Sequence, residues 1–232
     1  MESYSYSSPG PRSTNQDFIL DAKVDADTRL VCVADGVGGN NGGEIASKTA
    51  VEEFSKSFLE RSLSMEESVL HAHDKIREIG AENSNLHGMA TTLTALYVHD
   101  LELLGVHVGD SRAYILRGDG VMQLSMDHSE VARYLREGKL TKEEAANYPR
   151  KNVLYNALGM QKKPEVQTFK FSLEAGDRLA LMSDGVSGVV SKRTFRNLSK
   201  SSKTIEEFGE KLVSRVENGG VSDNYSIILL GL

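Results

Sequence analysis

The stretch of residues 30–39, LVCVADGVGG, decides the fold of this chain, because an apolar run ends there on a carboxylate. A run of β-branched and other apolar residues is typical of a buried strand. The carboxylate of Asp35 cannot stay unpaired in a core, since removing it from water costs several kcal/mol even after relaxation. The stretch therefore predicts a buried strand that brings Asp35 to a polar site at its end.

The same pattern recurs at other expected strand ends. Two more apolar runs end on a carboxylate, residues 103–110 (LLGVHVGD) at Asp110 and residues 178–184 (RLALMSD) at Asp184. Asp223 shows the reverse order, because it opens the final apolar strand. If that strand is antiparallel to the others, all four carboxylates can meet at one edge of a sheet. Clustered carboxylates repel one another unless cations lie between them, so the pattern predicts a metal site.

Length and composition indicate one soluble globular domain over residues 1–232. No Pro-, Gly- or Ser-rich linker divides the chain, and its 39% apolar and 26% charged residues are typical of globular proteins. The net charge of −6 argues against a nucleic-acid-binding surface. The one cysteine, Cys32, rules out an internal disulfide and fits a reducing compartment. With no leader and no apolar stretch of about 20 residues, we expect a cytoplasmic monomer without a membrane segment.

The periodicity of apolar residues predicts an α+β fold. Apolar residues four apart indicate a helix over residues 46–58, and a capping box of Ser64 with Glu67 opens a second helix. β character continues from Met89 to Leu124. The remaining expected elements are two short helices in a polar insertion at 129–150, strands at 166–171, 179–182 and 225–230, and one helix at 205–216. Two consecutive helices followed by antiparallel hairpins indicate two packed sheets with helices outside.

The residue types at the strand ends favour a hard divalent cation. Mg²⁺ and Mn²⁺ prefer oxygen ligands and keep several waters, whereas zinc sites use cysteine and histidine at short spacings. The sequence has no such cluster, and its six histidines are scattered, so we expect each to be structural or on the surface. Near the N-terminus, Arg12 precedes Asp17 by five residues. A guanidinium suits bidentate binding of a phosphate, and the carboxylate suits a metal-bound water.

Together these segments resemble the metal-dependent serine/threonine protein phosphatases of the type 2C (PPM) family. Seven motifs of that family occur in order along essentially the whole chain: RSTNQD at 12–17, VADGVGG at 33–39, GMATTL at 88–93, VGDSRAY at 108–114, DHS at 127–129, SDG at 183–185 and DNYS at 223–226. The resemblance implies the family's fold, a central β-sandwich of two antiparallel sheets flanked by pairs of antiparallel helices in four layers (αββα). It also implies hydrolysis of phosphoserine and phosphothreonine in proteins.

The resemblance assigns the metal ligands residue by residue. Asp35 would bridge two core ions, Mn²⁺ or Mg²⁺, with the carbonyl of Gly36 on the second ion. Asp184 and Asp223 would complete the shell of the first ion. Asp110 would join Asp184 in a third, weaker site that occurs in bacterial-type members.

The resemblance also implies a mechanism. A hydroxide held between the two cations would attack phosphorus in line and displace the seryl or threonyl oxygen without a phosphoenzyme. Asp17 would act through a metal-bound water, Arg12 would bind the substrate phosphate, and residues 129–155 correspond to the flap that shapes substrate access. The expected partners are phosphoserine and phosphothreonine proteins, with no nucleic acid and no membrane.

Three residues depart from the family pattern. Val37 stands where many eukaryotic members have a histidine proposed as general acid, so we expect a metal-bound water to protonate the leaving group; bacterial members commonly share this absence. Gln16 replaces a frequent glutamate, which is expected to weaken one water-mediated metal contact. Asn156 stands where bacterial relatives usually have arginine. That difference affects the anchoring of the flap or the choice of substrate, and it leaves the core chemistry intact.

Three other interpretations use the same residues. A phosphatase-like module could bind a phosphoprotein without hydrolysing it, but such proteins lose metal aspartates, and Asp35, Asp184 and Asp223 are all present. The glycine loop at 36–43 resembles a dinucleotide fingerprint, but no regular βαβ alternation follows it. A preference for small phosphorylated molecules over proteins stays open.

Overall fold

Two antiparallel sheets form the centre of the protein in its computed structural model, which describes residues 1–37 and 42–232. The five-stranded sheet has the order β1 (Glu2–Ser8), β11 (Tyr225–Gly231), β10 (Arg178–Met182), β7 (Arg112–Arg117) and β8 (Gly120–Gln123). The six-stranded sheet has the order β2 (Asp17–Lys23), β3 (Thr28–Val37), β5 (Leu93–His99), β6 (Glu102–Val108) and β9 (Gln167–Ser172), with the short β4 (Ala90–Thr91) paired to β3.

One inner strand of the six-stranded sheet, β3, is buried on both faces. Val31 and Val33 belong to the core between the two sheets, whereas Leu30, Cys32 and Ala34 belong to the core under the helices. Successive side chains of a strand point to opposite faces, so a strand that is covered on both sides needs apolar residues at every position. This explains why β3 is a continuous apolar run and not an alternating pattern.

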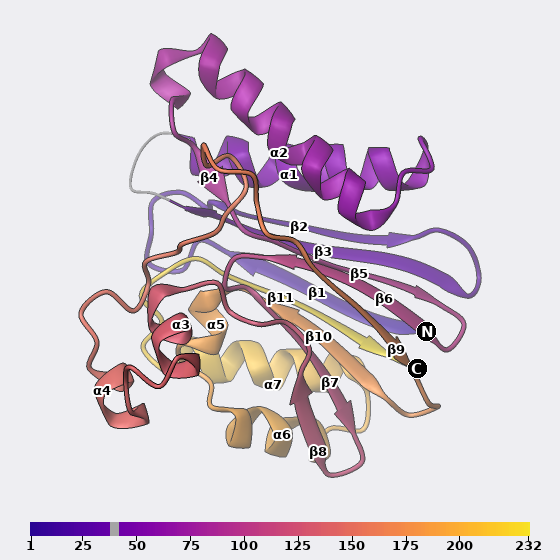
Figure 1. The fold of residues 1–232 in the computed structure, drawn as a ribbon. Coiled ribbons are helices and arrows are strands. Elements are labelled where there is room, and N and C mark those ends of the chain that lie inside the picture. The colour runs from indigo at the N-terminus through magenta and orange to yellow at the C-terminus, as the bar shows by residue number, and fades with distance from the viewer. Residues whose placement is uncertain (38–41) are drawn as a thin grey trace.

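Pairs of helices cover the outer faces of both sheets and complete four layers (Figure 1). The pair α1 (Gly43–Leu59) and α2 (Met65–Glu82) packs on the six-stranded sheet, and the pair α6 (Lys192–Lys200) and α7 (Ile205–Glu217) packs on the five-stranded sheet. In α1, Ala46, Ala50 and Phe54 form the buried stripe that the spacing of four predicts. The αββα arrangement confirms the fold expected from the sequence.

The remaining helices are short and lie near one end of the sandwich. The polar insertion holds α3 (Glu130–Arg136) and α4 (Lys142–Ala146), a single 3₁₀ turn η1 (Ser84–Leu86) follows α2, and α5 (Asp184–Ser187) follows β10. The capping boxes of Ser64 and Thr141 form as the sequence indicates. Among the helices of the described residues, none is long and apolar enough to cross a membrane.

The prediction of a single helix after β10 is wrong, because α5 and α6 precede α7. The first of these helices is only one turn long. In α6, Phe195 and Leu198 are the apolar residues that pack inward, against the core of the five-stranded sheet. Two apolar residues do not establish a helical period, so the rest of α6 looks like a polar loop in the sequence.

Candidate active site

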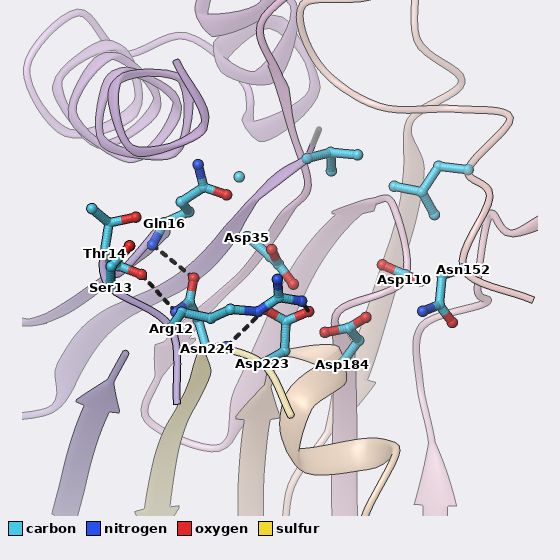
Figure 2. Close-up of a pocket in the computed structure, with 13 residues that line it drawn as sticks. Arg12, Ser13, Thr14, Gln16, Asp35, Asp110, Asn152, Asp184, Asp223 and Asn224 are labelled. Atoms are coloured by element: carbon cyan, nitrogen blue, oxygen red, sulfur yellow. Dashed lines mark hydrogen bonds and ion pairs between the residues drawn. The ribbon is translucent and has the colours of Figure 1, made fainter. Parts of the chain in front are cut away.

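A cavity of about 490 Å³ lies at the end of the sandwich where the strand-end carboxylates meet (Figure 2). The six-stranded sheet supplies Asp35 from the end of β3 and Asp110 from the turn after β6. The five-stranded sheet supplies Asp184 from the start of α5 and Asp223 from the loop before β11. The expectation that one sheet edge gathers all four is therefore wrong. Each sheet contributes two, because the sandwich stacks the ends of both sheets around the same cavity.

Asp17 joins this group through strand register. It lies directly opposite Asp35 on the neighbouring strand β2 and is 5% exposed. Its Oδ2 accepts a 2.7 Å hydrogen bond from the hydroxyl of Ser183, while its Oδ1 is buried and has no hydrogen-bond partner among the described residues. A buried carboxylate oxygen without a partner is costly, so this atom is available to a water or another donor.

The carboxylates raise one another's pKa values. Burial raises the pKa of Asp35 well above its ordinary value, and the charges of Asp17, Asp184 and Asp110 raise it further. Burial, with the charges of Asp184 and Asp127, raises the pKa of Asp110 to about 7. The pKa of Asp17 rises to about 6, mainly through burial and against the hydrogen bond that it accepts from Ser183. Without a cation, the site thus resists holding all of its carboxylates ionised at neutral pH.

These residues fit divalent cations of the Mg²⁺ or Mn²⁺ type. The donors are oxygen atoms, the buried Oδ1 of Asp17 lacks a partner, and mutual repulsion would be relieved by positive charge. Within the described residues, no three acidic, histidine or cysteine side chains converge on one ion position. Ions here would therefore keep several waters in their shells, which is the usual habit of Mg²⁺.

Arg12 lies on the rim of the cavity, on the loop before β2. Its Nη2 donates a 3.0 Å hydrogen bond to Oδ2 of Asp223, and the two side chains are 57% and 45% exposed. An exposed pair of this kind contributes at most about 1 kcal/mol, so the guanidinium can exchange one anion for another at low cost. The rim thus offers an anion-binding group directly beside a carboxylate cluster.

Asn224 holds the Arg12 loop in place, a role that the sequence did not reveal. Its Nδ2 donates to the carbonyls of Pro9 (2.9 Å) and Thr14 (2.8 Å), and its Oδ1 accepts from the backbone N–H of Gln16 (2.9 Å). Asn224, the residue next to Asp223, therefore holds the loop on both sides of Arg12. In the sequence, only its position next to Asp223 pointed to Asn224. Its hydrogen bonds join residues more than 200 positions apart, which no local pattern encodes.

Arg112 and Asp127 form a second charged pair next to the cavity. The Nε and Nη2 of Arg112 both donate to the carboxylate of Asp127, at 3.0 and 2.6 Å, and the side chains are 28% and 13% exposed. The charge of Arg112 opposes the rise in the pKa of Asp110, while that of Asp127 adds to it. Both residues lie within family motifs, but their pairing across 15 positions is not visible in the motifs themselves.

The insertion is fastened at its base by Asn156. This buried side chain donates through Nδ2 to Nδ1 of His128 and to the carbonyl of Glu165, both at 2.8 Å, and accepts from the N–H of Glu165 at 3.1 Å. His128 Nδ1 also accepts from the N–H of Gly109, next to Asp110, at 3.1 Å. The residue that departs from the family pattern thus ties the start of the insertion, its end and the Asp110 turn together.

The histidines behave as the sequence predicts in the buried part of the chain. His73, His107 and His128 are buried and hydrogen-bonded within the protein. Burial and the neighbouring His128 lower the pKa of His107 to about 3, so it is a neutral structural group.

Val37 and Gln16 both line the cavity. Residues 38–41 of the glycine loop lie outside the described residues.

The fold and the site together define a β-sandwich whose acidic cavity has an arginine on its rim, and comparison with known proteins gives its family. The sequence matches protein phosphatase 2C over residues 11–224, and the chain belongs to this family. It is 36% identical over 210 residues to the serine/threonine phosphatase stp of Listeria innocua, an alignment that covers 87% of this chain and 83% of that protein. The resemblance drawn from the seven motifs is confirmed.

Solved structures agree with this assignment. The S. agalactiae serine/threonine phosphatase superposes with a TM-score of 0.91 at 31% identity, covering 100% of this chain and 99% of that one. The catalytic domain of the serine threonine protein phosphatase PstP, solved in complex with two manganese ions, superposes with a TM-score of 0.83 at 29% identity, covering 98% and 96%. The predicted activity, a protein phosphatase, is the activity for which the family is named.

Proposed function

We propose that this protein is a Mn²⁺- or Mg²⁺-dependent phosphatase that hydrolyses phosphoserine and phosphothreonine in proteins. The observation that carries the proposal is the single cavity in which Arg12, on the rim, stands beside four aspartates contributed by both sheets. A phosphate ester is an anion, and it can approach such an acidic site only when cations occupy it. Binding of the phosphate ester in this cavity therefore depends on binding of the cations.

The proposed metal ligands are the residues that line the cavity floor. Asp35, the carbonyl of Gly36, Asp184 and Asp223 would hold two core ions, and Asp110 with Asp184 would hold a third. When bound, such cations would act as Lewis acids, lowering the pKa of a water and neutralising charge on the phosphoryl oxygens. The manganese-bound PstP structure supports this choice of metal by similarity.

Asp17 and Arg12 would handle the two reactants. Ser183 fixes Oδ2 of Asp17, which leaves Oδ1 free to accept a hydrogen bond from the attacking water and so to orient it. Arg12 would exchange its bond to Asp223 for a phosphoryl oxygen, where its planar fork suits a tetrahedral anion. Water would then displace the seryl or threonyl oxygen directly.

The surroundings support a protein substrate handled by one catalytic domain. The cavity is open to solvent beside the insertion at 129–155, which supplies Asn152 and Leu154 to its wall and would act as a flap over the bound polypeptide. We further propose that the chain works as a monomeric, cytoplasmic enzyme.

The test is hydrolysis of a phosphothreonine peptide by the purified protein with EDTA, Mn²⁺ or Mg²⁺ added in parallel. We expect activity that EDTA removes and Mn²⁺ restores. A phosphotyrosine peptide and p-nitrophenyl phosphate serve as comparisons. Faster turnover of free phosphothreonine, which has the same leaving group, than of the phosphothreonine peptide would favour small-molecule substrates. A folded protein that hydrolyses nothing with either metal would contradict the proposal.

A further inference from the structure

The helix α6 has a charge pattern that its own fold does not explain. Five cations, Lys192, Arg193, Arg196, Lys200 and Lys203, lie on this helix and the turn after it, and residues 185–205 contain no acidic residue. This basic stretch stands on a chain with a net charge of −6. We call the five side chains the α6 basic surface.

The arrangement of these charges opposes helix stability. Lys192 and Arg193 occupy the first turn, where the positive end of the helix dipole disfavours cations, and that turn has no acidic residue to offset them. Lys192, Arg196 and Lys200 follow one another at a spacing of four, which places like charges side by side. A helix that places cations unfavourably, both for its dipole and for one another, gains no stability from them. Such unfavourable placement is expected at functional surfaces.

The cations are also largely free of internal partners. Among the described residues, only Lys200 of the five forms an ion pair, with Asp119, and both of those side chains are at least half exposed. The Nε of Arg196 is buried and has no hydrogen-bond partner among the residues that the structure describes. Lys192 lies 5.8 Å from the centre of the Tyr114 ring and makes no ion pair there. Four of the five residues are exposed and Arg196 is half-buried, so most of this positive charge faces solvent.

Neighbouring hollows lie between this surface and the active site. The active-site cavity adjoins a second cavity of about 400 Å³ under the insertion, because both are lined by Asp110, Asn152 and Asp184. The second cavity adjoins a third of about 140 Å³ at the start of α6, because both are lined by Arg112 and Ser187. Lys192 lines this last hollow. An extended polypeptide that leaves the active site along this track arrives at the basic surface.

We propose that the α6 basic surface is a docking site for an acidic segment of the phosphoprotein substrate. The inference rests on the proposed function and adds a substrate class to it. Carboxylates of that segment would pair with the α6 cations while the phosphoresidue lies in the catalytic cavity. The length of α6 suits this, since nine residues span about 13 Å, which about four residues of extended chain match.

The apolar residues of α6 favour a protein segment over a lipid surface. Phe195 is 2% exposed, and Leu198 packs against the same core, so the apolar side of the helix is already used inside the protein. Helices that bind in the membrane interface keep an apolar face free for insertion. The outward face of α6 offers charge alone, at the end of a track that begins at the reacting phosphate.

The test compares two phosphothreonine peptides that differ only in their distal segment, which is a run of aspartates in one and of serines in the other. The variant is Lys192→Glu/Arg193→Glu, in which acidic residues at the helix start favour the dipole and keep the helix stable. The matched control is Lys48→Glu/Lys56→Glu on α1, which changes the net charge equally on the opposite helix layer.

We expect wild-type protein to prefer the aspartate peptide, with a preference that falls as salt rises. In the α6 variant, kcat/KM for that peptide should fall about tenfold, as expected when several exposed charge pairs are lost. Turnover of the serine peptide and of p-nitrophenyl phosphate should not change, and the α1 control should behave as wild type.

Other results overturn the inference in distinguishable ways. Equal rates on both peptides by an active wild-type protein would remove the docking site but leave the proposed function standing. An equal loss in the α1 control would reduce the effect to net charge. Unchanged peptide rates, combined with loss of binding to vesicles containing phosphatidylserine in the α6 variant, would assign the surface to a membrane. A wild-type protein that hydrolyses no phosphate ester with Mn²⁺ would remove both proposals.

Discussion

Carboxylates that face each other across neighbouring strands are usually avoided, because like charges directly opposite destabilise an antiparallel pair. Asp17 and Asp35 break this rule on β2 and β3, and the charges of Asp184 and Asp110 raise the pKa of Asp35 further. The metal-free protein therefore holds an electrostatic strain that bound cations would relieve.

This strain predicts a pH-dependent gain in stability from Asp110→Asn in the metal-free protein. The folded-state pKa of Asp110, about 7, lies above its unfolded value near 4, so the folded protein holds this proton more tightly than the unfolded chain does. The stability that this proton gives the folded state is therefore lost as pH rises from about 4 to 7. In EDTA, we expect the unfolding free energy of the variant to exceed that of wild type by about 3–4 kcal/mol at pH 8 and by about 1 kcal/mol at pH 5. Urea unfolding at both pH values, with the exposed Asp74→Asn as control, measures this. The same gain at both pH values would show that titration is not the cause.

Arg12→Ala should mainly weaken substrate binding. The guanidinium is exposed, and among residues 1–37 and 42–232 it pairs only with the exposed Asp223, so unfolding stability should change by less than about 1 kcal/mol. Loss of a bidentate contact to phosphate should raise KM for a phosphothreonine peptide by about tenfold or more, with a smaller change in kcat. Arg12→Lys keeps the charge and should recover part of the loss. An unchanged KM in Arg12→Ala would contradict the assignment.

The candidate site could be predicted from single residues where the signal is local. Asp35, Asp110 and Asp184 each follow an apolar strand, so the sequence alone identifies them. Three other features depend on pairing between distant segments. Asp17 lies opposite Asp35, Ser183 donates a hydrogen bond to Asp17, and Asn224 donates to the loop that holds Arg12. Those contacts follow from register and packing, which a residue's immediate neighbours do not encode.

The insertion and the Asp110 turn are linked through one side chain, Asn156. Its amide joins His128, which precedes the insertion, to Glu165, which follows it, and His128 in turn holds the N–H of Gly109. The fastening is buried, so a lost partner would leave unsatisfied backbone groups. An arginine in this position would need a different set of acceptors.

Asn156→Ala should loosen the insertion without removing the core site. We expect a loss of about 1–3 kcal/mol in unfolding free energy, since the N–H and carbonyl of Glu165 lose a buried partner. Trypsin should also cut within residues 129–155 faster than in wild type. The control is Asn147→Ala, an exposed asparagine of the same insertion whose side chain donates a hydrogen bond to the carbonyl of Glu143. Equal cleavage of both variants and wild type would show that Asn156 does not fasten the insertion.

At the level of elements, prediction succeeded where periodicity or capping was long enough to read. Helix α7 buries Phe208, Leu212 and Val216 at the predicted spacing, and Thr204 caps it. Helix α6 was missed because its sequence is dominated by cations, and tertiary packing overrides that weak local preference. The misread segment is the one that carries the proposed docking surface.

The whole molecule creates the site by stacking the ends of two sheets. Neither sheet holds the cluster alone, since β3 and β6 supply Asp35 and Asp110 while the strands β10 and β11 flank Asp184 and Asp223. The sequence predicted the layers and the meeting of the four carboxylates, but it did not reveal that they come from two sheets, because sheet order is set by long-range pairing. The central claim of this account is that this junction binds divalent cations.

Calorimetric titration of Mn²⁺ into metal-free protein tests that claim most directly, in wild type and in Asp35→Asn. We expect wild type to bind at least two ions, as in the manganese-bound relative, and to unfold at a higher temperature once loaded. Asp35→Asn should keep the fold and bind Mn²⁺ at least about tenfold more weakly, since an amide is a poorer ligand for a hard cation than a carboxylate. No binding by wild type, or identical isotherms for the two proteins, would contradict the account.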